Sequence, residues 1–321
     1  MRPVRLDPGC PKPLSGGRTA PLPGTMAEIC VVHLVRARNG IKPFEGFLRS
    51  YAEHPGGVEH DLIVVFKGFR GKVLPAEYQE AVSGLRPRRL FARDFGFDLR
   101  AYGLAARSFP CRYFCFLNSF SALLDAKWLE KLTRAISQPG VGLAGATGSC
   151  ESLYSNLLFA KPRNPEASPL ARLWQPLRIQ SCKWFFEPFP NWHLRTNAFM
   201  ISRELMLRVW PRWVLTKRGA YLFESGRRSL TRRIQALGLK ALVVGRDGQA
   251  CGSEAGARSR TFRQGNQENL LVADNQTREY ACADTATRQT LSRLAWGEQA
   301  DPGTGEPPPR AKAHSSITPI S

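Results

Sequence analysis

The sequence predicts an α/β domain built on a mostly parallel sheet with helices on both faces. Short apolar runs recur between residues 28 and 245, and segments with helical spacing separate them. The first two runs, 28–36 and 61–66, are apolar on both faces, as is typical of strands in covered parallel sheets. The length of 321 residues allows one large core. No fixed-period repeat indicates a solenoid or a propeller.

The predicted strands are short and rich in β-branched or aromatic residues. They cover 28–36, 61–66, 89–92, 112–117, 141–145, 196–202 and 240–245. Asn39-Gly40 follows the first strand and Lys67-Gly68 the second, and both dipeptides favour a turn.

The predicted helices alternate with these strands. They cover 43–51, 75–85, 98–107, 126–136, 203–209 and 225–237. Asp98 is placed to cap its helix, and Gly238 suits the C-terminal cap of the last one. Residues 153–189 are rich in Pro, Trp and Phe without sustained periodicity, and they predict either a mobile loop or a wall of an acceptor site.

The two ends differ in composition from the middle. We expect a disordered extension over 1–26, a domain over 27–298 and a disordered tail over 299–321, because both ends are rich in Pro and Gly. Met26 immediately precedes the first strand, so an alternative translation start there stays open. The N-terminal stretch lacks the apolar region of a signal peptide, and no apolar run approaches the ~20 residues of a membrane span.

The charge and the cysteines narrow the function classes. A formal net charge of +20 favours anionic partners such as nucleotide diphosphates, nucleic acid or an acidic membrane surface. A basic surface without a specific partner is an equal alternative. No nucleic-acid-binding motif is visible, so we expect no nucleic-acid partner. The eight cysteines include no CxxC pair; they predict mostly reduced structural cysteines in a cytoplasmic protein, with peripheral contact to the inner face of an acidic membrane left open.

The run from Asp94 to Leu132 resembles the central part of family 2-type glycosyltransferases, which have the GT-A fold. A polar turn precedes a helix of small residues, a buried strand follows, and a Trp-Leu pair begins the next helix. The matching positions are Gly96, Asp98, Ala105, Phe116, Leu117, Trp128 and Leu129. The segments 141–149 and 224–238 resemble later parts of the family, and the likeness spans roughly 28–297. Within the family the chain is most similar to rhamnan- or polysaccharide-synthesis transferases.

This resemblance implies a hexosyltransferase-type enzyme that moves a sugar from a nucleotide-sugar donor to a glycan or lipid-linked acceptor. The family usually coordinates Mn²⁺ or Mg²⁺ through an Asp-X-Asp motif, but this chain has Asn118-Ser119-Phe120 there. Neutral oxygens are poorer ligands for a hard cation than carboxylates. We therefore assign no metal ligands and expect cationic side chains to neutralise the leaving diphosphate, with Mn²⁺ or Mg²⁺ as an open alternative. A catalytically inactive protein that binds nucleotide sugars or glycans is the rival hypothesis.

Glu224 is the candidate catalytic base, at the position that resembles the family's catalytic acid. Transfer with inversion needs a carboxylate near the acceptor hydroxyl. A carboxylate stabilised by the N-terminus of the following helix is the structural alternative.

The candidate donor-binding residues follow predicted strands or enter predicted turns. They are Asp94, Gly96, Asp98, Asn118, Ser119, Lys67 and Arg195. Lys67 lies at the carboxyl end of the second strand, the edge at which α/β sheets bind ligands. A guanidinium such as that of Arg195 suits bidentate contact with phosphate.

The candidate acceptor-binding residues are His193, Asn197 and Arg227. Arg228 and Arg232 would share a face of the predicted helix 225–237, either as a solvated stripe or as a site for an acidic glycan or phosphate. The amide-rich stretch 261–277 resembles a segment of processive family members and predicts a lid or an acceptor-side segment.

Overall fold

The computed structural model describes residues 26–94, 98–160, 177, 179–211 and 217–298. The predicted extension up to residue 25, the predicted tail from 299 and Gly96 lie outside these ranges.

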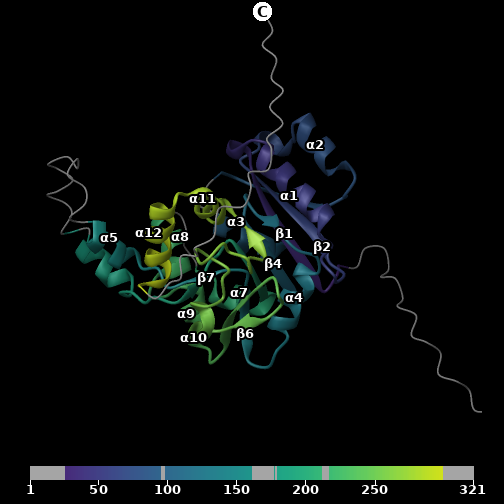
Figure 1. Ribbon diagram of the computed structural model, residues 1–321. Coiled ribbons are helices and arrows are strands. Elements are labelled where there is room, and N and C mark those ends of the chain that lie inside the picture. Colours follow the sequence, from purple (N-terminus) through teal and green to yellow (C-terminus); the bar gives the residue numbers. More distant parts are fainter. Residues whose placement is uncertain (1–25, 95–97, 161–176, 178, 212–216, 299–321) are drawn as a thin grey trace, which may run out of the picture.

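A mixed α/β architecture with a mostly parallel central sheet confirms the predicted fold class (Figure 1). Its strand order is β11-β10-β6-β9-β4-β1-β2-β3. The strands are β1 (Ile29–Arg36), β2 (Asp61–Lys67), β3 (Arg88–Ala92), β4 (Tyr113–Leu117), β6 (Val141–Gly145), β9 (Ala198–Ser202), β10 (Lys240–Val244) and β11 (Ala250–Cys251). β9 runs antiparallel to both of its neighbours, β4 and β6, and β11 runs antiparallel to β10. The remaining pairs are parallel.

Two small ribbons lie beside this sheet. β5 (Ala122–Leu123) pairs with β12 (Val272–Ala273), and β7 (Gly148–Ser149) pairs with β8 (His193–Leu194). The first ribbon attaches the C-terminal part of the chain to the residues that follow β4.

Helices cover both faces of the sheet. They are α1 (Lys42–Glu53), α2 (Ala76–Ser83), α3 (Asp98–Ser108), α4 (Trp128–Ile136), α5 (Leu153–Ala160), α7 (Arg203–Val209), α8 (Lys217–Ser225), α9 (Leu230–Gln235), α10 (Ser253–Gly256), α11 (Asn275–Cys282) and α12 (Thr285–Trp296).

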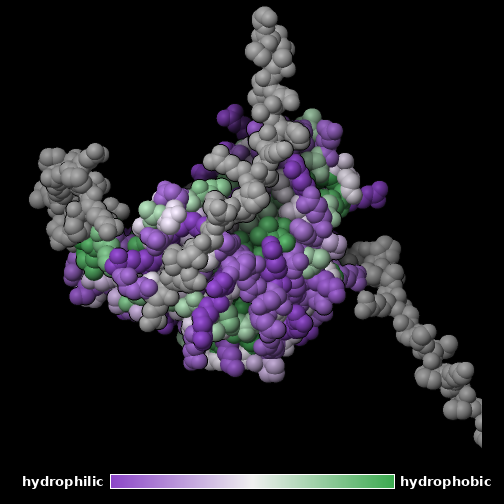
Figure 2. All heavy atoms as spheres, viewed as in Figure 1, coloured by the Kyte–Doolittle hydropathy of each residue, from purple (hydrophilic) through white to green (hydrophobic). Residues whose placement is uncertain are grey.

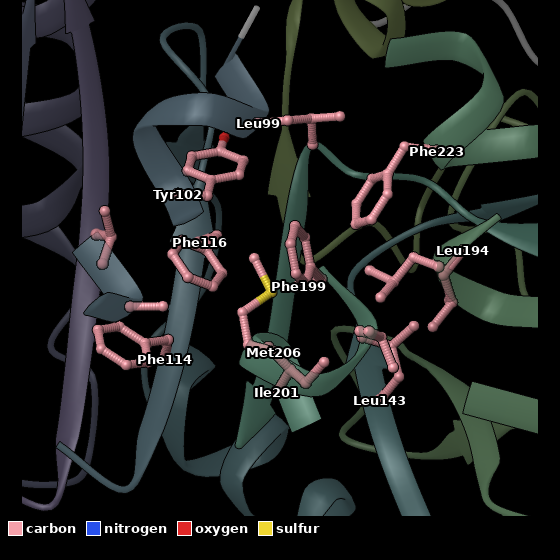
Figure 3. Close-up of a cluster of buried hydrophobic side chains, with 14 of the residues drawn as sticks. Leu99, Tyr102, Phe114, Phe116, Leu143, Leu194, Phe199, Ile201, Met206 and Phe223 are labelled. Atoms are coloured by element: carbon pink, nitrogen blue, oxygen red, sulfur yellow. The ribbon is translucent and has the colours of Figure 1, made fainter. Parts of the chain in front are cut away.

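The core has two layers because side chains alternate across each strand. From β1, Cys30, Val32 and Leu34 enter the layer that also holds residues of α3, α7 and α9. Val31 and Val35 enter the opposite layer, which α1, α2 and α4 cover. Figure 3 shows part of the first layer, where the aromatic rings of β4 and β9 pack beside α3.

The predicted helix 225–237 is wrong in its first half. α8 ends at Ser225, and Arg227 and Arg228 lie in the turn that follows. α9 begins only at Leu230, where the Ser229 side chain accepts the backbone N–H of Arg232. Serine at this position caps a new helix, so the two arginines do not share a helical face with Arg232.

Most of the described cysteines are free thiols, as predicted, but one pair is not. Cys30 of β1 and Cys111, just before β4, form a disulfide across 81 residues, with their Cα atoms 6.3 Å apart. Parallel pairing of β1 with β4 brings these distant positions together. Cys115, Cys150 and Cys182 are among the cysteines that remain free thiols.

None of the described helices is both long and apolar enough to cross a bilayer. The face seen in Figure 2 is largely hydrophilic, with a hydrophobic group at the left where Figure 1 places α5. Leu158 and Phe159 of that helix are 43% and 57% exposed.

Gly103 of α3 permits the close approach of Trp210. A Cβ atom at this position would lie 2.5 Å from the indole ring, inside van der Waals contact.

We expect Gly103→Ala to lower the free energy of unfolding by about 1–3 kcal/mol, because overpacking forces the ring or the helix to move. Gly46→Ala in α1 is the matched control. Its added methyl meets nothing within 4 Å, so we expect an unchanged or higher stability. Equal denaturant midpoints for the two variants would contradict this packing.

Candidate active site

The carboxyl ends of the parallel strands meet at one edge of the sheet. β1 ends at Arg36, β2 at Lys67 and β4 at Leu117. The antiparallel β9 begins at this edge, and the Asn118 N–H donates to the carbonyl of Asn197 over 2.9 Å. This is the edge at which open α/β sheets bind ligands.

A cavity of about 150 Å³, which we call the central cavity, opens at this edge. Residues from α3, the end of β4, the approach to β9, α8 and the start of α11 line it. They are Asp98, Leu99, Tyr102, Asn118, Arg195, Thr196, Asn197, Ala220, Glu224, Asp274, Asn275 and Gln276. Five of the residues predicted from sequence therefore meet in one place: Asp98, Asn118, Arg195, Asn197 and Glu224.

Glu224 enters the central cavity from the last turn of α8. Its Oε2 accepts the backbone N–H of Thr196 over 2.8 Å and also the Thr196 hydroxyl. These two bonds fix the direction of the carboxylate. The structural alternative considered from sequence, a carboxylate at a helix N-terminus, is wrong because Glu224 lies at the other end of a helix.

A charged cluster lies next to the cavity, across the ends of β1 and β2. Arg36 reaches Asp94 at 3.2 Å and Asp98 at 3.6 Å. Burial raises the pKa of Asp98, and the charges of Arg36 and Lys67 oppose the rise. Lys67 is 1% exposed, and burial together with Arg36 lowers its pKa to about 8. The buried Lys67 and the partly buried Arg36 thus place two cations at this edge, beside the carboxylates of Asp94 and Asp98.

Beyond this cluster lies a second and larger cavity of about 500 Å³, which we call the β1–β2 cavity. It is lined by Ala37, Gly40, Gly68, Phe69, Arg70, Val73, Leu74, Pro75, Glu77 and Tyr78. Gly68 adjoins Asp94 so closely, at a φ of +83°, that a Cβ there would lie 3.1 Å from the Asp94 Cβ. The two cavities are thus linked along the sheet edge through Asp94, Arg36 and Asp98.

Arg195 is held by the protein itself. Its Nη2 lies 2.8 Å from Oδ2 of Asp274, and the two side chains are 5% and 1% exposed. The guanidinium also lies over the Phe262 ring, 4.0 Å from its centre. Burial alone would raise the pKa of Asp274, but the charge of Arg195 and the N–H of Thr277 outweigh burial and lower it. Arg195 therefore contributes to the cavity wall as one half of a buried ion pair.

Asn118 and Asn197 shape the wall between β4 and β9. The Asn118 Oδ1 accepts the N–H of Phe120 over 2.9 Å, which closes the turn after β4. The Thr147 hydroxyl donates to the Asn197 Oδ1 over 2.7 Å. Asn197 Nδ2 and Ser119 Oγ are buried without a hydrogen-bond partner in the described residues. Ser119 does not line the central cavity.

Two predicted acceptor residues lie elsewhere. His193 is 3% exposed in β8; burial lowers its pKa, and its Nδ1 lies 2.8 Å from the Asn191 carbonyl. Arg227 pairs with Glu187 at 2.6 Å, outside the central cavity. The predicted lid 261–277 is largely buried, and Arg263, Gln264 and Gln267 are each less than 7% exposed. Most of it is therefore part of the domain interior.

Sequence reasoning missed several residues of the cavity. Asp274 begins a capping box with Thr277, a signal visible in the sequence Asp-Asn-Gln-Thr, but nothing local places it beside Arg195. Tyr102 is buried, and its hydroxyl has no hydrogen-bond partner in the described part of the chain. Figure 3 shows Tyr102 and Leu99 on α3, with Phe223 of α8 across from them.

The described residues contain no cluster of three or more His, Cys, Asp or Glu side chains arranged to hold a metal ion. Of the carboxylates that line the central cavity, Asp98 pairs with Arg36, Asp274 pairs with Arg195, and Glu224 accepts hydrogen bonds from Thr196.

Among known proteins, we found similarity to solved structures but not to a family model or a curated protein. The chain is similar to a mannosyltransferase from Pyrobaculum calidifontis in complex with GDP-Man and Mn²⁺, with 14% identity and a TM-score of 0.43 over 75% of this chain and 62% of that one. It thus spans about three fifths of that mannosyltransferase.

Two further similarities are weaker. Core-mannan synthase A from Aspergillus fumigatus has 7% identity and a TM-score of 0.36 over 68% of this chain and 71% of its own. Glucosyl-3-phosphoglycerate synthase from Mycobacterium tuberculosis, in complex with Mn²⁺, UDP and glucosyl-3-phosphoglycerate, has 15% identity and a TM-score of 0.34 over 56% and 57%. Identities and scores this low assign no family, and we therefore base the function on the site.

Proposed function

We propose that this protein is a GT-A-type glycosyltransferase that moves a hexose from a nucleotide-sugar donor to a glycan or lipid-linked acceptor in polysaccharide biosynthesis. The observation that carries the proposal is the position of Glu224. Its anchored carboxylate enters a polar cavity at the ligand-binding edge of the sheet, next to the cations of Arg36 and Lys67.

The sizes of the two cavities fit a nucleotide-sugar donor whose sugar and base lie in different cavities. Ligand pockets for whole cofactors usually have about 300–1,000 Å³. The central cavity, with about 150 Å³, fits only the sugar end. The β1–β2 cavity has about 500 Å³ and offers the ring of Phe69 to a base. A diphosphate between them would lie at Arg36 and Lys67.

In the proposed sugar transfer, Glu224 acts as the general base. The acceptor oxygen attacks the anomeric carbon, and the bond from that carbon to the diphosphate oxygen breaks. The electron pair leaves with the nucleoside diphosphate, and the acceptor proton passes to Glu224. Attack opposite the leaving group inverts the anomeric configuration. Asp98 and Asn118 would orient the sugar hydroxyl groups.

We further propose that the transfer does not require a metal ion. Asn118-Ser119-Phe120 supplies no carboxylate, whereas Arg36 and Lys67 place two cations at the sheet edge, where Asp94 and Asp98 pair with Arg36. Cations fixed in a buried site can stabilise a leaving diphosphate without a metal.

Thermal unfolding in the presence of nucleotides tests this function. We expect UDP, GDP or another nucleoside diphosphate at 100 times its Kd to stabilise the chain by about 2.7 kcal/mol, and we expect the same shift with EDTA. Stabilisation that appears only with Mn²⁺ would contradict the metal-independent site. No response to any nucleoside diphosphate would contradict the donor site, and binding without sugar transfer would leave the inactive binding protein as the better hypothesis.

A further inference from the structure

Helix α8 carries a second cavity on its other side. This α8 cavity has a volume of about 510 Å³ and is lined by Trp184, Phe185, Pro211, Gly219, Leu222, Phe223, Arg227, Arg228 and Arg233. The central cavity takes Ala220 and Glu224 from the same helix. One helix therefore separates the candidate catalytic carboxylate from a cavity that the proposed chemistry does not use.

The wall of the α8 cavity is apolar and partly open to solvent. Trp184 is 73% exposed and Phe185 is 44% exposed, although both are large aromatic side chains. Phe223 closes the inner side, where it is 3% exposed. A grouped set of exposed apolar residues beside a cavity indicates a binding surface for an apolar group.

Arginines surround this apolar wall. Arg228 has no carboxylate partner in the part of the chain that the structure describes, and Arg233 uses its side chain to donate to the carbonyls of Arg228 and Val209. Burial, followed by the charge of Arg228, lowers the pKa of Arg233. Glu187 is engaged by Arg227 at 2.6 Å. The described lining of the cavity contains no acidic side chain, so the rim keeps positive charge that a phosphate group would complement.

We propose that the α8 cavity binds an anionic amphiphile, with an apolar chain against Trp184 and Phe223 and a phosphate group at Arg228 and Arg233. The identification of this molecule as the acceptor rests on the function proposed above. Arg228 follows Glu224 by four residues, just beyond the end of α8. To serve as the acceptor, the molecule would extend its head group around the C-terminal end of α8, because Glu224 lies on the opposite side of this helix. The acceptor is then a phosphate-bearing lipid rather than a free glycan.

Calorimetric titration of the full chain tests the cavity. The probe is dodecyl phosphate below the concentration at which it forms micelles, compared with inorganic phosphate and with uncharged dodecyl maltoside. We expect saturable binding of dodecyl phosphate and at least tenfold weaker binding of the other two probes. Inorganic phosphate lacks the apolar chain, and dodecyl maltoside lacks the phosphate group.

Two variants locate the site. Arg228→Gln and Trp184→Ala should each weaken dodecyl phosphate binding by about tenfold, the scale of one charge-assisted contact or one buried aromatic ring. Arg232→Gln is the matched control, because Arg232 is exposed on α9 and does not line the cavity. Its binding should equal that of the unchanged protein. An equal loss in the Arg228 and Arg232 variants, or equal affinity for all three probes, would overturn the proposal.

Nucleotide binding measured on the same samples separates this proposal from the proposed function. Dodecyl phosphate binding that depends on Arg228, without binding of any nucleoside diphosphate, would support the cavity while contradicting the transferase. Nucleotide binding without dodecyl phosphate binding would overturn the cavity and leave the transferase standing.

Discussion

Glu224→Gln is expected to lower the rate of sugar transfer by about 10²–10⁴-fold, the usual contribution of a positioned general base. The amide keeps an oxygen that can accept the N–H of Thr196, but it cannot take the acceptor proton. Binding of the nucleoside diphosphate should change by less than about twofold, since the nucleotide is proposed to lie along β1 and β2. Single-turnover rates and nucleotide affinity, measured on one preparation, check both expectations.

The control for this variant is Glu254→Gln, an exposed carboxylate in α10. We expect it to keep full activity. A purely structural role for Glu224 would show itself as a lower midpoint of thermal unfolding with the transfer rate retained. Full activity at an unchanged midpoint would remove Glu224 from the mechanism.

Arg195→Met is expected to be strongly destabilising. It leaves the Asp274 carboxylate, 1% exposed, without its cation. Breaking a buried pair in this way costs about 3–5 kcal/mol, because one uncompensated charge stays buried. Denaturant unfolding measures this loss. Arg195→Met combined with Asp274→Asn should recover most of it, since neither charge then remains and the Asn oxygen can still accept the N–H of Thr277.

The pH dependence of stability gives a second measurement of the same pair. The folded-state pKa of Asp274 is below its ordinary value of 3.8. The pair therefore contributes its full stability above pH 3.8 and loses it as the pH falls through the folded-state pKa. The double variant should lack this loss. A double variant as unstable as Arg195→Met, or one with the same acid limb as the unchanged protein, would show that the pair does not act as described.

The α/β architecture followed from local pattern. The runs that became β1, β2, β4 and β10 are apolar and contain β-branched or aromatic residues, and segments of helical spacing separate them, so their type and order were readable within a few residues. The direction of β9 was not readable. A strand has the same side-chain period in either direction, and only its pairing with β4 and β6 sets it antiparallel.

The helix before β10 shows where a local pattern misleads. Ser229 reads as one more helical residue in an apolar-periodic run, yet it caps a second helix. The turn at Arg227 and Arg228 forms because Arg227 donates its backbone N–H to the Phe185 carbonyl, a contact 42 residues away in sequence. Such contacts outweigh the small helix propensity of a single turn.

What the sequence by itself determined is the fold class, the absence of a carboxylate at Asn118-Ser119-Phe120 and the candidate residues that follow strand ends. Strand ends are predictable as ligand sites because parallel strands bring their carboxyl ends to one edge. Only the tertiary structure decided that Glu224 points at Thr196, that Asp274 binds Arg195, and that α8 separates two cavities. Glu224 and Thr196 are separated by 28 residues and Arg195 and Asp274 by 79, and spacing along a chain does not fix distance across a core.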